Sequence, residues 1–240
     1  MAKRKQPELF AGDKAAAKRR WRIGEVERRC KRQGLWPIIG TDEVGRGPLA
    51  GPVVAAAVVL EDGARLKGLD DSKLLTEASR EALVPKIEAQ ALAWSVVEGP
   101  VALIDSVNIL QASMWAMRQA VEEVWNSLLD AGATMPKLVV VDGNTPIPEL
   151  VRPGQKTYVK GDQRSRAIAA ASILAKVHRD RLMVRVADEH PGYGFAGHKG
   201  YPTAEHLAAL KKLGPTPHHR SSFAPVRAAI ARQTAQTSSQ

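Results

Sequence analysis

The pattern of apolar and polar positions along the chain changes character near residue 100. Before that point, three runs rich in Val, Ile and Ala follow one another at short intervals, and such runs are typical of buried strands. We expect strands over residues 36–44, 51–60 and 91–99, paired as an antiparallel meander because they succeed one another so closely. The segment between the first two, GTDEVGRGPLAGP, reads as a glycine-rich turn.

Beyond residue 100 the apolar positions recur at helical spacing. The stretch 108–132 carries one apolar stripe, with Trp115 and Trp125 packed at its edge. The stripe consists of Ile109, Met114, Met117, Val121, Val124 and Leu128. A continuous apolar run over 137–144 follows this helix and therefore predicts a buried parallel strand.

The last third of the chain predicts a short strand and then helices. We expect the strand over 157–162 and helices over 165–190 and 203–214. Thr203 and Gly214 are a typical N-cap and C-terminal stop for the second helix. Together these elements predict an α/β fold: a mixed five-stranded sheet flanked by helices, with a small C-terminal helical region.

The formal net charge of +10 is concentrated at the N-terminus. Residues 1–35 hold 12 Lys and Arg against 4 Asp and Glu, a surplus of 8, and we expect a basic, disordered arm containing a short helix that ends at Gly34. The domain is expected over 36–228 and a polar tail over 229–240. Such an arm suits nucleic acid, and a solvated tail that only aids solubility is the alternative.

Composition also limits the class of protein. No apolar run reaches the roughly 18 residues of a membrane helix, and no apolar signal segment follows the basic N-terminus. The single cysteine, Cys30, excludes an internal disulfide and a cysteine-rich zinc site. We therefore expect a cytoplasmic protein without a membrane partner, and nothing in the sequence requires more than a monomer.

Acidic residues stand where predicted strands end. Asp42 and Glu43 end the first strand, Asp142 ends the strand after the long helix, and Asp162 precedes the next helix. Ligands of open α/β sheets collect beyond the carboxyl ends of the strands, so these acids predict a cage of hard oxygens for Mg²⁺ or Mn²⁺. The metal would supply the positive charge that adjacent carboxylates lack.

Each acid also has a simpler interpretation. Asp42 and Glu43 could mark a solvated turn, as could Asp142, while Asp162 could cap a helix. Neighbours on an ideal strand point to opposite faces. The first two acids therefore share a site only if the strand twists or ends there, and the glycines that follow favour such an ending.

Several motifs, in order, resemble the type 2 ribonucleases H, the bacterial ribonuclease HII family. DEVGRG matches the family signature D-E-x-G-R-G, and later blocks include VVVDGN, VKGDQRSRAIAAASILAKVHRDRLM and HKGYPTAEHLAALKKLGPTPHHRSSFAPV. The resemblance spans residues 36 to 228. It implies a ribonuclease H-like fold and an endonuclease that hydrolyses the RNA strand of RNA–DNA hybrids. It also implies incision at ribonucleotides embedded in duplex DNA, leaving 3′-hydroxyl and 5′-phosphate ends.

The resemblance further implies residue roles and cofactors. The ligands that it implies for two Mn²⁺ or Mg²⁺ ions are Asp42, Glu43, Asp142 and Asp162. The family loop that reads the ribose 2′-hydroxyl corresponds to Gly45, Arg46 and Gly47. Tyr201 looks like the family tyrosine that senses the RNA-to-DNA junction. Two-metal hydrolysis needs no histidine as a base.

Basic side chains could contact substrate phosphates. The candidates are Lys73, Lys160, Arg164 and Lys176, with Arg179 and Arg220 as further ones. His218 and His219 show no metal-ligand spacing, and we expect them at the surface or on phosphate. Asp180, in the middle of a long helix, is expected in an exposed ion pair.

Two other functions stay open at this point: a junction resolvase on the same fold, and a hybrid-binding module without catalysis. The loop for the 2′-hydroxyl and Tyr201 disfavour the first, and the full set of acids disfavours the second. Within the arm, QPELF, residues Gln6–Phe10, resembles the peptides by which bacterial replication and repair proteins dock onto the sliding clamp. A chance match is the alternative, since Pro7 stands where leucine is more usual.

Overall fold

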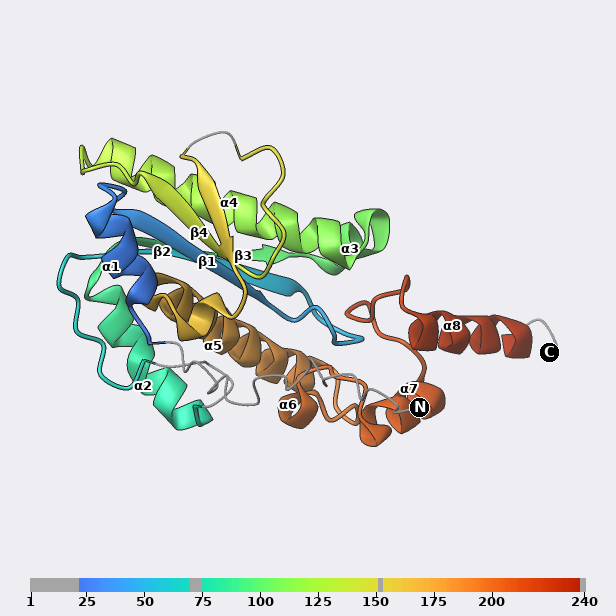
Figure 1. The fold of residues 1–240 in the computed structure, drawn as a ribbon. Coiled ribbons are helices and arrows are strands. Elements are labelled where there is room, and N and C mark those ends of the chain that lie inside the picture. Colours follow the sequence, from blue (N-terminus) through green and yellow to red (C-terminus); the bar gives the residue numbers. More distant parts are fainter. Residues whose placement is uncertain (1–21, 70–74, 151–152, 238–240) are drawn as a thin grey trace, which may run out of the picture.

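The computed structural model describes residues 22–69, 75–150 and 153–237. A five-stranded sheet in the order β3–β2–β1–β4–β5 lies at its centre, with helices on both faces (Figure 1). The strands are β1 Ile38–Val44, β2 Val53–Leu60, β3 Ala91–Gly99, β4 Leu138–Asp142 and β5 Gln155–Tyr158. The helices are α1 Glu25–Arg32, α2 Glu77–Glu88, α3 Val101–Val107, α4 Ile109–Asp130, α5 Arg166–Glu189, α6 Phe195–His198, α7 Ala204–Leu213 and α8 Ala224–Thr237.

Strand pairing confirms the expected mixed sheet. β1, β2 and β3 form an antiparallel meander, while β4 pairs parallel with both β1 and β5. The fifth strand lies earlier than the expected 157–162, because its pairing with β4 ends at Tyr158. Lys160 then adopts a left-handed conformation (φ 54°), which turns the chain into a short 3₁₀ helix over Gly161–Gln163.

The two long helices cover opposite faces of the sheet because side chains alternate along β2. One set packs with α4, namely Ala55, Ala57 and Val59. The other set packs with α5, namely Val54, Ala56 and Val58. α5 crosses β1 so closely that a Cβ on Gly40 would lie 2.3 Å from the backbone carbon of Ala167. The glycine therefore permits the approach that places α5 over the carboxyl end of β1.

The short helix expected within residues 1–35 is α1, and it packs against the domain. Val26 and Cys30 are buried in a cluster with β1 and α5 residues. The carboxylate of Glu27 accepts a hydrogen bond of 2.7 Å from the hydroxyl of Ser165, at the start of α5. Residues 22–35 thus carry core contacts, while residues 1–21 lie outside the described part of the chain.

The sequence pattern does not predict α2, α3, α6 or α8. α2 contains Pro85, but Thr76 caps its first turn and accepts a hydrogen bond from the amide of Ser79. α8 continues to Thr237 through the segment that we expected as a polar tail, and its Val226 and Ala229 are buried. α6, α7 and α8 follow the C-terminal end of α5, where α8 extends away from the sheet (Figure 1). In the described ranges, no helix is long and apolar enough to cross a membrane.

Candidate active site

Three of the four predicted acids meet at one edge of the sheet. Parallel pairing of β1 with β4 brings Asp42 and Asp142 to neighbouring strand ends. Glu43 follows at the end of β1, and all three side chains line one cavity of about 490 Å³. β1 stays paired with β2 as far as Val44, one residue beyond Glu43, whereas its pairing with β4 stops at Thr41. The two consecutive acids nevertheless line the same cavity.

Asp162 lies beside this cavity but is not among the residues that line it. Its side chain is buried in the 3₁₀ turn, and the amide of the preceding Gly161 donates to Oδ1 of Asp142 at 2.6 Å. The turn is therefore attached to the acidic cluster through its backbone. The capping alternative for this acid is wrong, because the side chain that caps α5 is that of Ser165.

Burial and neighbouring acids raise the pKa of Asp42 and that of Glu43. Burial, followed by the charges of Asp142 and Glu43, holds the pKa of Asp42 well above its usual range, against a hydrogen bond from Ser172. Burial also raises the pKa of Glu43, against Arg46, whose Nη1 lies 3.2 Å from its Oε1. Hard carboxylate oxygens whose ionised forms are disfavoured this way fit a divalent cation such as Mg²⁺ or Mn²⁺.

The glycine–arginine–glycine loop forms the rim of the same cavity. Gly45 adopts φ +94°, and a Cβ there would lie 2.2 Å from Nε of Arg179, so both its conformation and its surroundings require glycine. A Cβ on Gly47 would lie 3.5 Å from the ring of Tyr201. This ring is 41% exposed and lines the cavity, so it stands beside the loop at the mouth of the site.

Two fully buried arginines support the loop from below. Arg220 donates to the carbonyls of Gly45 at 2.6 Å, Arg46 at 3.1 Å and Gly51 at 2.9 Å. Arg179 donates at 3.0 Å to the carbonyls of Ala50, Pro52 and Lys199. The expectation that these two residues contact phosphates is wrong, because neither guanidinium reaches the surface.

Some of the other basic residues line the carboxylate cavity and some do not. Lys176 lines the cavity, and its Nζ donates to Asp180 Oδ1 at 2.7 Å. Asp180 is buried, so its expected exposed ion pair is wrong. Arg80 of α2 also lines the cavity, at 3.8 Å from Asp180, and it was missed because α2 itself was not predicted.

The remaining candidates stand apart from the cavity lining. Arg164 forms an ion pair of 2.7 Å with Glu25 of α1. Lys160 is exposed on the turn that precedes Asp162. Lys73 lies outside the described residues.

His219, which we expected at the surface, is buried. It is 4% exposed, and its Nε2 lies 3.1 Å from Nε2 of His206. Its Nδ1 accepts from the amide of Thr216 at 2.9 Å. The two histidines belong to a buried aromatic cluster with Tyr193 and Phe195, which holds α7 beneath the C-terminal segment.

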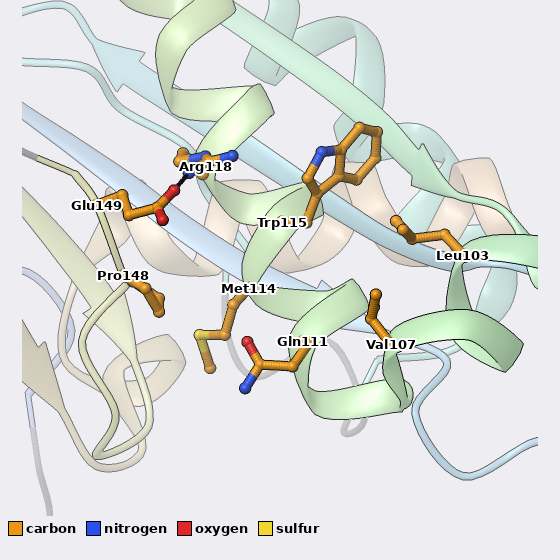
Figure 2. Close-up of a pocket in the computed structure, with 8 residues that line it drawn as sticks. All are labelled: Leu103, Val107, Gln111, Met114, Trp115, Arg118, Pro148 and Glu149. Atoms are coloured by element: carbon orange, nitrogen blue, oxygen red, sulfur yellow. Dashed lines mark hydrogen bonds and ion pairs between the residues drawn. The ribbon is translucent and has the colours of Figure 1, made fainter.

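A second hollow, of about 280 Å³, lies between α3, the start of α4 and the segment that holds Pro148 (Figure 2). Its lining is largely apolar, with Leu103, Val107 and Met114 at its walls. Arg118 and Glu149 pair at one end of it (Figure 2). Glu149 is the one acid among the described residues that line it, whereas three acids line the carboxylate cavity.

The sheet order and the carboxylates at the ends of adjacent parallel strands define a hydrolase with the ribonuclease H-like fold. The family model described as ribonuclease HII matches residues 39–226. This chain belongs to the ribonuclease HII family. Members of this family are metal-dependent ribonucleases H that degrade RNA in RNA–DNA hybrids.

Proteins of similar sequence and solved structures of similar fold support the same family assignment. Ribonuclease HII of Cupriavidus metallidurans is 51% identical over 202 residues, which cover 84% of this chain and 86% of that protein. Ribonuclease HII 2 of Methylibium petroleiphilum is 54% identical over 191 residues, covering 79% and 83%. The crystal structure of ribonuclease H2 from Pyrococcus horikoshii has a TM-score of 0.66 at 26% identity, covering 81% of this chain and 97% of that one. An Archaeoglobus fulgidus ribonuclease HII, solved in complex with PCNA, has a TM-score of 0.62 at 25% identity, covering 77% and 93%.

Proposed function

We propose that this ribonuclease H, besides hydrolysing the RNA of RNA–DNA hybrids, incises duplex DNA at single embedded ribonucleotides and leaves 3′-hydroxyl and 5′-phosphate ends. One observation carries the proposal: three of the acids, the glycine loop and Tyr201 line a single cavity. A ribose 2′-hydroxyl and the adjoining phosphodiester are neighbours on one nucleotide. A single ribonucleotide is therefore long enough to contact both the loop and the acids.

The residues that would hold metal are Asp42, Glu43 and Asp142, with Asp162 as a further ligand from the adjoining turn. When bound, two Mn²⁺ or Mg²⁺ ions would activate a water and stabilise the departing 3′-oxygen. The cavity lining contains no histidine in the described part of the chain, so no imidazole is assigned as a base. Both ions accept carboxylate oxygens, and the donor set suits either one.

The chain's own residues position the ribonucleotide. The backbone of Gly45–Gly47 presents peptide groups to the sugar with no Cβ in the way at the two glycines, and the 2′-hydroxyl distinguishes ribose from deoxyribose. The Tyr201 ring, next to Gly47 and partly exposed, would stack on the sugar that follows. Lys176 and Arg80 supply positive charge on the α5 and α2 side of the cavity for substrate phosphates.

A cleavage assay on three labelled duplexes tests this function: a hybrid, a DNA duplex with one ribonucleotide, and the same duplex in DNA alone. With Mn²⁺ or Mg²⁺ we expect cleavage of the first two, on the 5′ side of the single ribonucleotide, and none of the third. D142N serves as the inactive control. Cleavage of an all-DNA four-way junction, run beside the three duplexes, would favour a resolvase instead. Binding without cleavage would favour a hybrid-binding module.

We further propose a cytoplasmic monomer that acts in DNA replication and repair. Docking on the sliding clamp through Gln6–Phe10 belongs to this proposal, although that segment lies outside the described residues. The complex of the archaeal relative with PCNA supports the idea that ribonucleases HII bind a sliding clamp.

A further inference from the structure

Three potential metal ligands converge outside the carboxylate cavity. Glu189 ends α5, His190 follows it, and His218 lies on the segment that leads to the buried Arg220. One donor atom from each of the three lies within 4.8 Å of the others. Nε2 of His218 lies 3.5 Å from Oε2 of Glu189, and the rings of His190 and His218 meet edge to face with centroids 5.2 Å apart.

We propose that Glu189, His190 and His218 form a second cation site, selective for a borderline transition metal of the Zn²⁺ type. Two imidazoles and one carboxylate suit Zn²⁺, whereas Mg²⁺ and Mn²⁺ prefer oxygen donors such as those of the first site. Donors about 2.1 Å from a tetrahedral Zn²⁺ lie about 3.4 Å from one another. The His218–Glu189 separation of 3.5 Å matches this spacing.

A second histidine–glutamate pair on the same molecule shows what distinguishes the cluster. His178 and Glu98 lie 2.7 Å apart, the distance of a direct hydrogen bond, and no third donor joins them in the described part of the chain. In the proposed site the pair is wider and a second imidazole converges on it. His178 therefore offers a matched control on the same helix, α5.

The surroundings leave room for a ligand on the metal. A cavity of about 390 Å³ is lined by Glu189 and His218, together with Arg185, Glu98 and apolar side chains that include Val101 of α3 and Leu182 of α5. A three-ligand zinc site keeps one position open, and here it would face this cavity. Arg185 brings the opposite charge to Glu98 within the lining, so a water or a small anion is the expected fourth ligand.

Binding would join two segments that are distant in sequence. The carbonyl of His218 accepts from the amide of Gly51 at 2.9 Å, and His219 forms a β-bridge with Ala50. A metal would therefore clamp the end of α5 to the segment that carries Arg220. Metal binding is expected to stabilise the protein, because an ion that binds only the folded chain raises the free energy of unfolding.

The test uses tag-free, full-length D42N protein, stripped of metal, so that the acid site is weakened as a competitor. Titration calorimetry with ZnCl₂ is expected to give one site per chain, and melting temperature is expected to rise with Zn²⁺ but not with equal Mg²⁺. Adding H218A or H190A is expected to weaken Zn²⁺ binding at least tenfold, E189Q to weaken it less, and H178A to leave it unchanged. Co²⁺ is expected to give tetrahedral visible absorption that H218A abolishes.

Circular dichroism of each metal-free variant shows first that it is folded, and any variant that is not folded is replaced by one of the other two. Absence of Zn²⁺ binding, or equal binding by H190A, H218A and H178A, would overturn the site. Neither result would bear on the nuclease function, which the other cavity carries.

Discussion

The guanidinium of Arg220 donates to the carbonyl of Gly45 at 2.6 Å, although 175 residues separate the two in sequence. Its other hydrogen bonds also go to carbonyls, those of Gly51 and Arg46, so its charge stays beneath the glycine–arginine–glycine loop. Burial and the nearby Arg179 lower the pKa of Arg220 to about 9, and the side chain remains charged at neutral pH.

Replacing Arg220 with Lys keeps a charge but loses the planar fork of donors. We expect R220K to lose about 3 kcal/mol of unfolding free energy, since buried carbonyls lose charged partners. We also expect at least a tenfold lower kcat/KM on a single-ribonucleotide duplex, because the loop moves. Urea denaturation and cleavage below the melting transition measure the two effects. R181K, at an exposed position, is the control, and wild-type stability in R220K would contradict the supporting role.

Replacing Asp42 with Asn removes a charge that the folded, metal-free protein disfavours. Because the pKa of Asp42 is raised, its ionised form costs stability above that pKa, and D42N is expected to melt at a higher temperature at pH 7 without metal. Cleavage is expected to fall at least about a hundred- to a thousandfold. Mn²⁺ should stabilise the wild type more than the variant.

The matched control for Asp42 is D62N, since Asp62 is an exposed acid in a surface pair with Lys31. We expect D62N to cut at the wild-type rate. Near wild-type cleavage by D42N with saturating metal would refute the proposed metal site, whatever the melting temperatures.

His219 makes stability depend on pH. Burial, followed by the charge of His206, lowers its pKa to about 4 from 6.5. A lowered folded pKa means that the stabilising contribution is present above pH 6.5 and is lost as pH falls toward 4, by about 3 kcal/mol. Urea denaturation of wild type and H219Q between pH 7.5 and 4 measures it.

The comparison of wild type with H219Q isolates the contribution of His219. Asp42 and Glu43, whose pKa values are raised, change the unfolding free energy with pH in the opposite direction, but both proteins contain them. We expect H219Q to be less stable at pH 7.5 but to lose less stability on acidification. If the unfolding free energies of wild type and H219Q changed in parallel from pH 7.5 to 4, the pKa of His219 would not be lowered by its burial.

Removing residues 1–21 tests the basic arm and keeps α1 together with the β1 and α5 residues that it packs against. These residues hold seven Lys and Arg against two Asp and Glu, a net +5. We expect weaker hybrid binding and a shallower slope of log K against log salt, with the cut position unchanged. A full-length variant with the seven basic residues changed to Gln is the control for length, and it should behave like the deletion. Identical slopes for all three proteins would exclude contact between arm and substrate.

The clamp proposal is tested with a labelled peptide covering residues 1–15, titrated with the sliding clamp of the same organism. Burial of Leu9 and Phe10 would contribute on the order of 3–6 kcal/mol before ordering costs, so weak binding is expected. A peptide with Leu9→Ala and Phe10→Ala should not bind. Equal binding by both peptides would rule out the motif.

The sequence alone was sufficient for strands β1 to β4, for the helices α4, α5 and α7, and for the meeting of three of the four acids. The apolar runs of β1 and β2, and the stripe of α4, follow from backbone periods of two and 3.6 residues, which are local properties. Asp42, Glu43 and Asp142 could be predicted to meet because parallel strands end at one edge of a sheet. The sequence did not predict α2, because Pro85 interrupts its pattern, or α8, because its composition is polar.

Only the tertiary structure decided which charged and polar side chains are buried. Arg179, Arg220, His219 and Asp180 look like surface residues in the sequence, where their charge is all that can be read. Their burial depends on carbonyls, imidazoles and amines that distant segments bring to them, such as Gly45 for Arg220 and Lys176 for Asp180. A buried polar group is stable only with such partners, and the partners exist only once the chain has folded.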